Sequence, residues 1–272
     1  MIPLVCFVLT VLVVNSCEGK PAQFKGYPEE NRNVNNPNLF EGDMLVDPEV
    51  KKIALAGGDI SMATASRKRG TTKLHIWPSG RIPYVIEPSV PSIHRDKIEK
   101  AMREWENGTC LSFVPYVQNS GDVYMKISGN LPGCFAIVGY IPIPPHLPKK
   151  FRGLTLNLGP GCFQHRVFLH ELGHVIGFYH EQSRPDRDSY VNILTDNIMR
   201  GRDNDFRKYG TRRIDSLGSP YDLKSVMHYG PKTFSKNGQN TIEPVDPNQT
   251  LENNENISVT DKQQVNLLYN CV

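Results

Sequence analysis

Three histidines and one glutamate lie close together near the middle of the chain, and this group restricts the local fold more than any other stretch. Residues 168 to 191 read FLHELGHVIGFYHEQSRPDRDSYV. His170 and His174 are four residues apart, so on an α-helix both imidazoles project from one face and can reach a single metal ion, with Glu171 close to that face. A helix that continued six residues further would direct His180 to the opposite side. The helix must therefore end and the chain must turn back if His180 is to join the same ion.

Gly177 provides such an end, because glycine readily adopts the left-handed conformation at the C-terminal cap of a helix. The HExxH pattern alone recurs by chance, and the alternative is a set of core and surface histidines. The added glycine and third histidine favour a metal site. Three neutral imidazoles leave zinc with at least one open position, which is typical of a catalytic centre. With Glu171 as the general base, the predicted chemistry is zinc-assisted hydrolysis of an amide.

The first 69 residues resemble processing segments. Residues 1–19 contain an apolar run from Leu4 to Val14, which is too short to span a membrane. We predict that it is a signal peptide; the alternative is a short anchor or a buried strand. The sequence does not decide whether the signal peptide is cleaved at Ser16, Cys17 or Gly19. Residues 20–69 are polar and Asn-rich, with one possible short helix over 47–56, and lack a core of their own. They end in a basic cluster at Arg67, Lys68 and Arg69, where we predict propeptide cleavage by a trypsin-like or subtilisin-like protease, the alternative being an ordinary charged linker.

The cysteines and the charge add two constraints. Four of the six cysteines remain after the predicted signal peptide, and an even number in a secreted domain indicates two disulfides, for which three pairings are possible. The formal net charge of +3 is too small to indicate nucleic-acid binding. Sequons that could carry glycans in a secreted protein begin at Asn107, Asn248 and Asn256.

Between the predicted propeptide and the histidines, the pattern favours a sheet with helices packed on it. Predicted strands lie within residues 81–87, 122–128, 134–140 and 154–158. An amphipathic helix is expected over 92–109, capped by Ser92, with a buried stripe at Ile93, Ile98, Ala101, Met102 and Trp105. The prolines of residues 141–151 predict an exposed loop. A short helix is expected over 260–268 near the end of the chain.

Several motifs together closely resemble the astacin family of metzincin zinc endopeptidases. They are HELGHVIGFYHEQSRPDRDSY with SVMHYG, and also IWPSGRIPYVI, CLSFVPY and the closing LYNC. The resemblance covers the chain from Trp77 to Cys271. It implies an α+β catalytic domain over residues 70–272, with two lobes divided by the active-site cleft. The upper lobe would hold a twisted sheet and helices, and the lower lobe would be mostly irregular with a C-terminal helix.

The resemblance also implies a role for individual residues of the centre. His170, His174 and His180 would be the zinc ligands and Glu171 the general base. Tyr229 would be a further zinc ligand that can swing away to stabilise the oxyanion. Met227 would form the Met-turn below the metal, and Glu181 would receive the mature N-terminus.

The resemblance extends to the disulfides, the cleft and the propeptide. Cys110 would pair with Cys271, and Cys134 with Cys162. The strand that begins at Cys134 would bind substrate as an added antiparallel strand. In the propeptide, FEGDM resembles the prosegment motif whose aspartate, here Asp43, occupies the zinc and keeps the enzyme latent.

Three departures from the family pattern affect the expectations. Cleavage after Arg67 restores the common spacing to Trp77, whereas cleavage after Arg69 leaves the mature chain two residues shorter. The loop between Cys134 and Cys162 carries a proline-rich insertion. Asn254 stands where many members have an arginine that favours acidic residues after the cut, so we do not expect acidic selectivity. No EGF-like or CUB-like extension follows Val272, which predicts a minimal enzyme.

The sequence therefore predicts a secreted, extracellular zinc endopeptidase that binds one zinc ion and cleaves extended protein or peptide substrates. It would be made as a latent zymogen, work as a monomer, and need neither nucleic acid nor a membrane anchor. One alternative is a pseudoprotease that only binds its partner, but binding alone would not need Glu171. Another is a hydrolase of small amides, which would have no use for an extended cleft strand.

Overall fold

A computed structural model describes residues 31, 34, 36, 39–46, 76–143, 148, 152–210 and 216–271. The predicted signal peptide, the short helix over 47–56 and the basic cluster at 67–69 lie outside these residues, as does most of the proline-rich loop. Within the described ranges, no helix combines the length and the apolar character that crossing a membrane would require.

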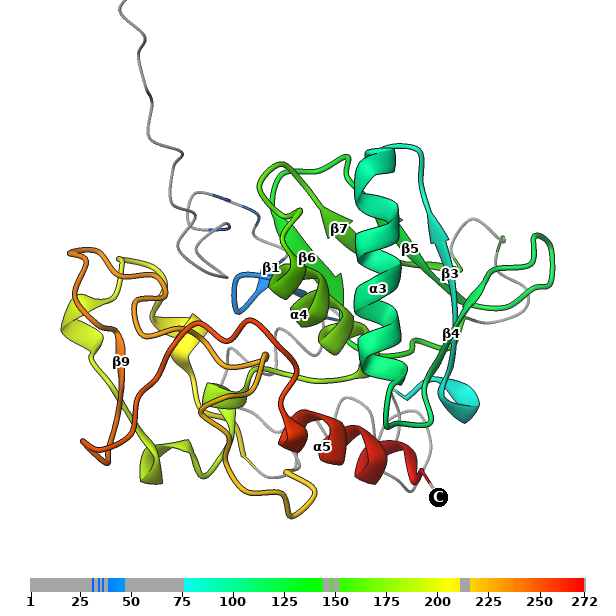
Figure 1. The fold of residues 1–272 in the computed structure, drawn as a ribbon. Coiled ribbons are helices and arrows are strands. Elements are labelled where there is room, and N and C mark those ends of the chain that lie inside the picture. Colours follow the sequence, from blue (N-terminus) through cyan, green and yellow to red (C-terminus); the bar gives the residue numbers. More distant parts are fainter. Residues whose placement is uncertain are drawn as a thin grey trace, which may run out of the picture.

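The upper lobe is built on a mixed sheet of seven strands (Figure 1), which supports the predicted α+β architecture. Its order is β1-β2-β6-β7-β5-β3-β4. Strand β6 runs antiparallel to β7, whereas β7, β5, β3 and β4 run parallel to one another. The five strands of the domain itself are β3 (Arg81–Ile86), β4 (Ser112–Pro115), β5 (Tyr124–Ser128), β6 (Cys134–Ile137) and β7 (Gly153–Leu158). The other two, β1 (Leu39–Phe40) and β2 (Met44–Leu45), come from the predicted propeptide and lie beyond the edge of β6.

The alternation predicted for the strands is confirmed. Val123, Met125 and Ile127 of the β5 segment are buried, as are the three leucines at 154, 156 and 158 of β7. These side chains form one face of the main hydrophobic core, to which α3 and α4 add the other side. Both helices lie in front of the sheet in Figure 1.

The first helix differs from the prediction at both ends, and it stops at Glu106 instead of continuing to Thr109. A 3-10 turn spans Ser92–His94, and the α-helix α3 covers only Arg95–Glu106, with no side-chain cap at its beginning. Ser92 is therefore not its cap. Ile93 is 75% exposed, because it belongs to this turn and falls outside the helical period, whereas Ile98, Ala101, Met102 and Trp105 are buried as expected.

Helix α4 (His165–Ile176) carries the first two histidines and is fixed at both flanks. The Trp105 indole of α3 donates to the Leu169 carbonyl at 3.0 Å. At the C-terminal end, the Trp77 indole donates to the Val175 carbonyl and the Tyr269 hydroxyl donates to the Ile176 carbonyl, at 2.8 and 2.7 Å. These bonds satisfy carbonyl groups that a helix end leaves without partners.

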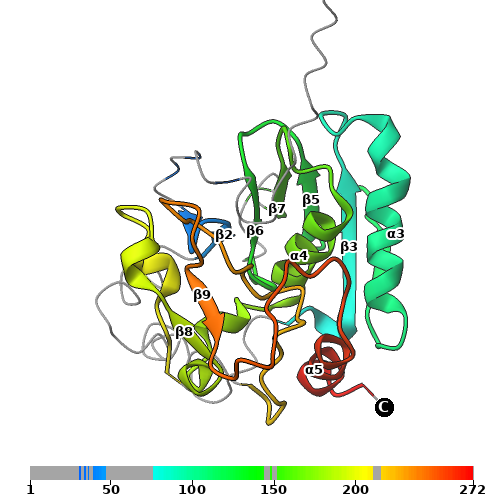
Figure 2. The ribbon, with the colours of Figure 1, turned by 60° about the vertical axis from the view of Figure 1, so that its left-hand side comes forward.

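The lower lobe follows α4 and has a second, smaller core. It contains the two-stranded sheet of β8 (Val191–Ile193) and β9 (Ile242–Pro244), and 3-10 turns at Glu181–Ser183, Arg187–Ser189, Thr195–Asn197 and Asp203–Phe206. The chain then returns to the upper lobe as α5 (Val259–Tyr269), the red helix of Figure 2. A disulfide joins Cys271 to Cys110, so the end of α5 is attached to the segment before β4.

Candidate metal centre

The third histidine reaches the first two because α4 ends where the glycine predicts. Helix α4 stops at Ile176, and Gly177 has φ +127°. The N–H groups of Gly177 and Phe178 both bond back to the Gly173 carbonyl, at 3.2 and 3.0 Å. The chain then reverses and brings His180 to the face of α4 that carries His170 and His174.

Four side chains converge on one point. The Nε2 atoms of His170 and His174 are 3.0 Å apart, and those of His170 and His180 are 3.3 Å apart. The fourth member is Asp43 of the predicted propeptide, whose carboxylate lies 3.1 Å from His180 Nε2, 3.6 Å from His170 Nε2 and 3.5 Å from His174 Nε2. All four side chains are fully buried, and their ligand atoms lie within 4.8 Å of one another.

The outer nitrogen of each imidazole identifies the tautomer. Each Nδ1 has an oxygen partner at 2.8 Å: the Val226 carbonyl for His170, the Phe178 carbonyl for His174 and the Glu41 carboxylate for His180. These oxygens only accept, so each Nδ1 carries the proton and each Nε2 directs its lone pair toward the shared point. Three lone pairs and one carboxylate at this spacing need a cation between them, and a donor set of three nitrogens and one oxygen suits zinc.

Burial and neighbouring charges act on the imidazoles in different ways. At His180 the Asp43 and Glu41 carboxylates outweigh burial and raise the pKa to about 9, so they favour positive charge at this point, which a zinc ion supplies in place of the proton. Burial lowers the pKa of His170 to about 3, so its imidazole is neutral at physiological pH, as a metal ligand must be. Burial alone would raise the pKa of Asp43, but His180 and the other imidazoles hold it well below its ordinary value. Asp43 is thus an anion aimed at the metal position.

Glu171 follows His170 on α4 and is fully buried, with a position fixed by the helix. On the opposite side, Tyr229 packs against His180 with ring centroids 4.5 Å apart. Its hydroxyl donates to the Glu41 carbonyl at 2.6 Å. Burial raises the pKa of Tyr229 well above its ordinary value, so the hydroxyl keeps its proton.

Met227 lies in a turn that packs directly on α4. A Cβ on Gly173 would be only 2.3 Å from Met227 Sδ, so the sulfur fills the space that a side chain at position 173 would occupy. The preceding residue supplies the carbonyl that accepts from His170. The turn therefore supports the metal centre from below, and glycine at position 173 permits its close approach.

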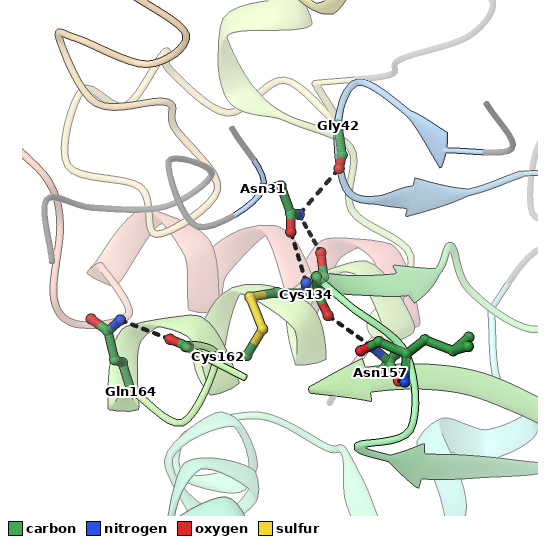
Figure 3. Close-up of a disulfide and its surroundings, with 9 residues drawn as sticks. Asn31, Gly42, Cys134, Asn157, Cys162 and Gln164 are labelled. Atoms are coloured by element: carbon green, nitrogen blue, oxygen red, sulfur yellow. Dashed lines mark hydrogen bonds between the residues drawn. A yellow bond between two sulfur atoms is a disulfide. The ribbon is translucent and has the colours of Figure 1, made fainter. Parts of the chain in front are cut away.

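The sequence did not predict the contributions of two residues of the predicted propeptide. Glu41 accepts from His180 Nδ1 and from the Ser183 hydroxyl, at 2.8 and 3.1 Å. Asn31 joins the β1–β2 turn to strand β6 (Figure 3): its Nδ2 donates to the Gly42 and Cys134 carbonyls at 3.1 and 2.5 Å, and its Oδ1 accepts from the Cys134 N–H at 2.8 Å. Asn31 thus pairs with the Cys134 peptide as a neighbouring strand would. Its short polar segment carries no periodicity that could have indicated this.

Two glycines allow other residues to come close to the backbone around the β1–β2 turn and before β6. Gly133 has φ +92°, and a Cβ there would be 2.7 Å from Asn31 Oδ1. Gly42 has φ +82°, and a Cβ there would be 2.8 Å from the Phe234 ring. Asn157 braces the loop before β6, donating to the Leu131 and Gly133 carbonyls at 2.9 and 2.7 Å.

Glu181, the residue after the third histidine, lies away from the metal point. Its Oε1 accepts from Arg184 and from the Asp222 N–H at 3.0 and 2.9 Å. Burial raises the pKa of Glu181 by more than Arg184 lowers it, and Asp261 and Asp222 raise it further. Glu181 and these two aspartates form an acidic cluster beside Arg184 that a second cation would stabilise.

Two disulfides join Cys110 to Cys271 and Cys134 to Cys162, the pairing that the resemblance implied. The second lies directly beside the Asn31 contact in Figure 3.

The three sequon asparagines, Asn107, Asn248 and Asn256, are exposed. Asn254 lies in the lower lobe, and its Nδ2 donates to the Leu223 and Ser225 carbonyls, both at 3.0 Å.

Comparisons with known proteins agree with this geometry. The family model described as Astacin, a peptidase family, matches residues 69–270. Zinc metalloproteinase nas-15 of Caenorhabditis elegans is 42% identical over 200 residues, which is 73% of this chain and 33% of that protein. Blastula protease 10 of Paracentrotus lividus is 37% identical over 241 residues, covering 85% of this chain and 38% of the relative. The chain thus spans well under half the length of these two relatives.

Among solved structures, the chain is similar to high choriolytic enzyme 1, a hatching enzyme zinc-protease of the medaka fish Oryzias latipes. The TM-score is 0.66 at 31% identity, and the match covers 75% of this chain and 99% of the other. The match supports the two-lobed metzincin architecture expected from the sequence.

Proposed function

Because this chain belongs to the astacin family of zinc metalloproteinases, we propose that it is a secreted endopeptidase, made as a latent precursor, that hydrolyses internal bonds of extended protein segments. The observation that carries the proposal is the convergence of three imidazole Nε2 atoms and one propeptide carboxylate on a buried point. The first three belong to the enzyme, and the fourth leaves with the propeptide.

In the active enzyme, His170, His174 and His180 would hold the zinc ion. Bound there, zinc supplies a Lewis acid for the substrate carbonyl and lowers the pKa of water. Glu171 then accepts a proton from the attacking water on a carboxylate oxygen and delivers it to the nitrogen of the leaving amine. The Tyr229 hydroxyl, which keeps its proton, donates to the developing oxyanion once the Glu41 carbonyl has left. Met227 supports this arrangement from below.

Latency follows from the contacts of the propeptide. Asp43 takes the position that the substrate and water need, and Glu41 engages the side chains of both His180 and Tyr229. Strand β2 lies along β6, the edge on which we propose that substrate adds as an antiparallel strand. The propeptide therefore blocks the metal, the oxyanion donor and the substrate edge together.

We place the signal peptide at residues 1–19, the propeptide at 20–69 and the catalytic domain at 70–272. An activating trypsin-like or subtilisin-like protease would cut after Arg67 or Arg69. The new N-terminal ammonium group would lie beside the acidic cluster around Glu181, whose raised pKa favours a cationic neighbour. Two disulfides support an extracellular location, where Asn107, Asn248 and Asn256 would be available for glycosylation.

The test is cleavage of casein or gelatin by the purified precursor before and after limited trypsin treatment. Activity should appear only on processing, and it should vanish with a zinc chelator and in a Glu171→Gln variant. If processed, zinc-loaded wild type cut neither these proteins nor a peptide library, a pseudoprotease that only binds its partner would be the better explanation. Cleavage of a dipeptide but not of a long polypeptide would instead indicate a hydrolase of small amides.

A further inference from the structure

The turn that carries Met227 is held by the first turn of α5. The Ser225 hydroxyl donates to Asp261 Oδ1 at 2.6 Å, and the Val226 N–H donates to Asp261 Oδ2 at 3.1 Å. Asp261 is 2% exposed, so these bonds are shielded from water. The two elements are 35 or 36 residues apart in the sequence, and Asp261 is therefore a specific tertiary contact.

Asp261 also completes the capping box of α5. Its N–H donates to the Ser258 hydroxyl at 2.9 Å, and its Oδ2 accepts from the Ser258 N–H at 2.9 Å. A helix cap needs only this exchange with Ser258. The bonds to Ser225 and Val226 are additional, and they place the Met227 turn at a fixed position relative to the helix.

From Val226 the path continues to the metal centre. Asp261 holds the N–H of Val226, and the carbonyl of the same residue accepts from His170 Nδ1 at 2.8 Å. The Ser225 hydroxyl also accepts from the Met227 N–H at 3.0 Å, which keeps the turn closed around the same atoms. Asp261 is thus linked to His170 through one backbone residue. The acceptor on the outer nitrogen of a ligating histidine sets its tautomer and ring orientation.

We propose that Asp261 is a positioning residue of the zinc centre, which holds the Val226 carbonyl at His170 Nδ1 and so orients the His170 imidazole toward the metal. The proposal rests on the proposed function in that the three histidines bind zinc. It assigns the C-terminal helix a part in metal binding, although no residue of that helix is a ligand. Asn254 is a second brace on the same turn, through the Leu223 and Ser225 carbonyls.

The chain offers a matched control, because the cap and the turn can be separated. Asp261→Ala removes the carboxylate bonds to Ser225, Val226 and Ser258, and it leaves the backbone N–H of residue 261 bonded to the Ser258 hydroxyl. Ser258→Ala removes the cap hydroxyl but leaves Asp261 free to accept from Ser225 and Val226. Ser225→Ala removes the hydroxyl link and leaves the capping box intact. Zinc affinity of each precursor is measured by competition with a chromophoric chelator, and the visible spectrum is recorded after cobalt substitution.

Asp261→Ala should weaken zinc binding about 10- to 100-fold, the range found for outer partners of metal ligands, and should change the cobalt spectrum. Ser225→Ala should weaken zinc binding by a smaller factor. Ser258→Ala should leave the zinc affinity within about twofold of wild type, even if it lowers the thermal stability of the protein as much as Asp261→Ala does. After processing, Asp261→Ala should lower kcat more than it raises KM.

Equal zinc affinities for Asp261→Ala and Ser258→Ala would overturn the proposal, and so would a wild-type cobalt spectrum in Asp261→Ala. If Asp261→Ala did not fold, Ser225→Ala with wild-type affinity would have the same meaning. Failure of the proposed function would be visible separately, as a wild-type protein that does not bind zinc or does not cleave protein after processing.

Discussion

Replacing Gly173 by alanine should destabilise the protein, although alanine is the better helix former. The new Cβ would lie 2.3 Å from Met227 Sδ and 3.3 Å from Met227 Cε, so the sulfur has to move by roughly an ångström. Overpacking of this kind costs about 1–3 kcal/mol. Because the contact is very short, we take the upper part of that range and subtract about 1 kcal/mol for the helix propensity of alanine over glycine. The expected loss in the free energy of unfolding is about 1–2 kcal/mol.

The assay is urea unfolding of the precursor at one fixed excess of zinc, with the zinc Kd of each variant measured so that the contribution of metal binding can be subtracted. A double-mutant cycle with Met227→Ala isolates the contact. Met227→Ala alone should cost about 2–5 kcal/mol by leaving a cavity. In the double variant the alanine methyl enters that space, so the combined loss should be at least about 1 kcal/mol smaller than the sum of the single losses.

Two results would refute the reasoning. One is a Gly173→Ala protein as stable as wild type or more stable, which would mean that Met227 moves without cost. The other is additivity of the two substitutions within about 0.5 kcal/mol, because neighbours that compete for one space must couple.

Four further predictions concern latency, cross-links and pH. Asp43→Ala should let the unprocessed precursor cleave casein, and adding Glu171→Gln should abolish that activity; a silent Asp43→Ala precursor would show that other contacts suffice for latency. Asn31→Ala removes three hydrogen bonds at about 1 kcal/mol each, and so should raise the residual activity of the precursor about 10- to 100-fold in the casein assay. Replacing Cys110 and Cys271 by serine should cost about 5 kcal/mol in urea unfolding, against about 3.6 kcal/mol for the Cys134–Cys162 pair, because the first disulfide spans 161 residues and the second 28. Burial raises the pKa of Asp205 to about 7, against the effect of Arg202, so its contribution to stability should be present below about pH 4 and lost as the pH rises through about 7; urea unfolding at several pH values should show wild type losing stability relative to Asp205→Asn over that window.

Much of the upper lobe was predictable, because its elements bury one face with a regular period. Alternation identified β5 and β7, and the apolar stripe identified α3. The predicted start of α3 was wrong because a 3-10 turn breaks the period at Ile93, and the predicted end was three residues too late. The last helix was expected from residue 260 and begins at Val259, where the capping box of Ser258 and Asp261 is a local signal.

The histidine spacing predicted the metal centre because both signals are local. Histidines four residues apart share one face of a helix, and a glycine marks where that helix ends. The residues that orient this centre were not predictable in the same way. Glu41, Val226 and Asp261 act through contacts between segments that are far apart in the sequence, and no periodicity marks them. The same holds for β1 and β2, whose two-residue strands are too short to give a pattern.

The β1–β2 turn has a consequence for how the proposed protease could carry its propeptide as an inhibitor without digesting it. Glu41 and Gly42 both have positive φ, at 48° and 82°, so the chain bends sharply just before the metal point. Strand β2 then runs parallel to β6, whereas the substrate proposed above would run antiparallel. The inhibitor therefore follows the same edge with its direction reversed, and it offers the metal a side-chain carboxylate in place of a peptide carbonyl. Direction and chemistry together place a side-chain ligand, and no peptide bond oriented as in the proposed substrate, at the centre, so under the proposed latency we expect the segment to be released by a cut elsewhere in the chain.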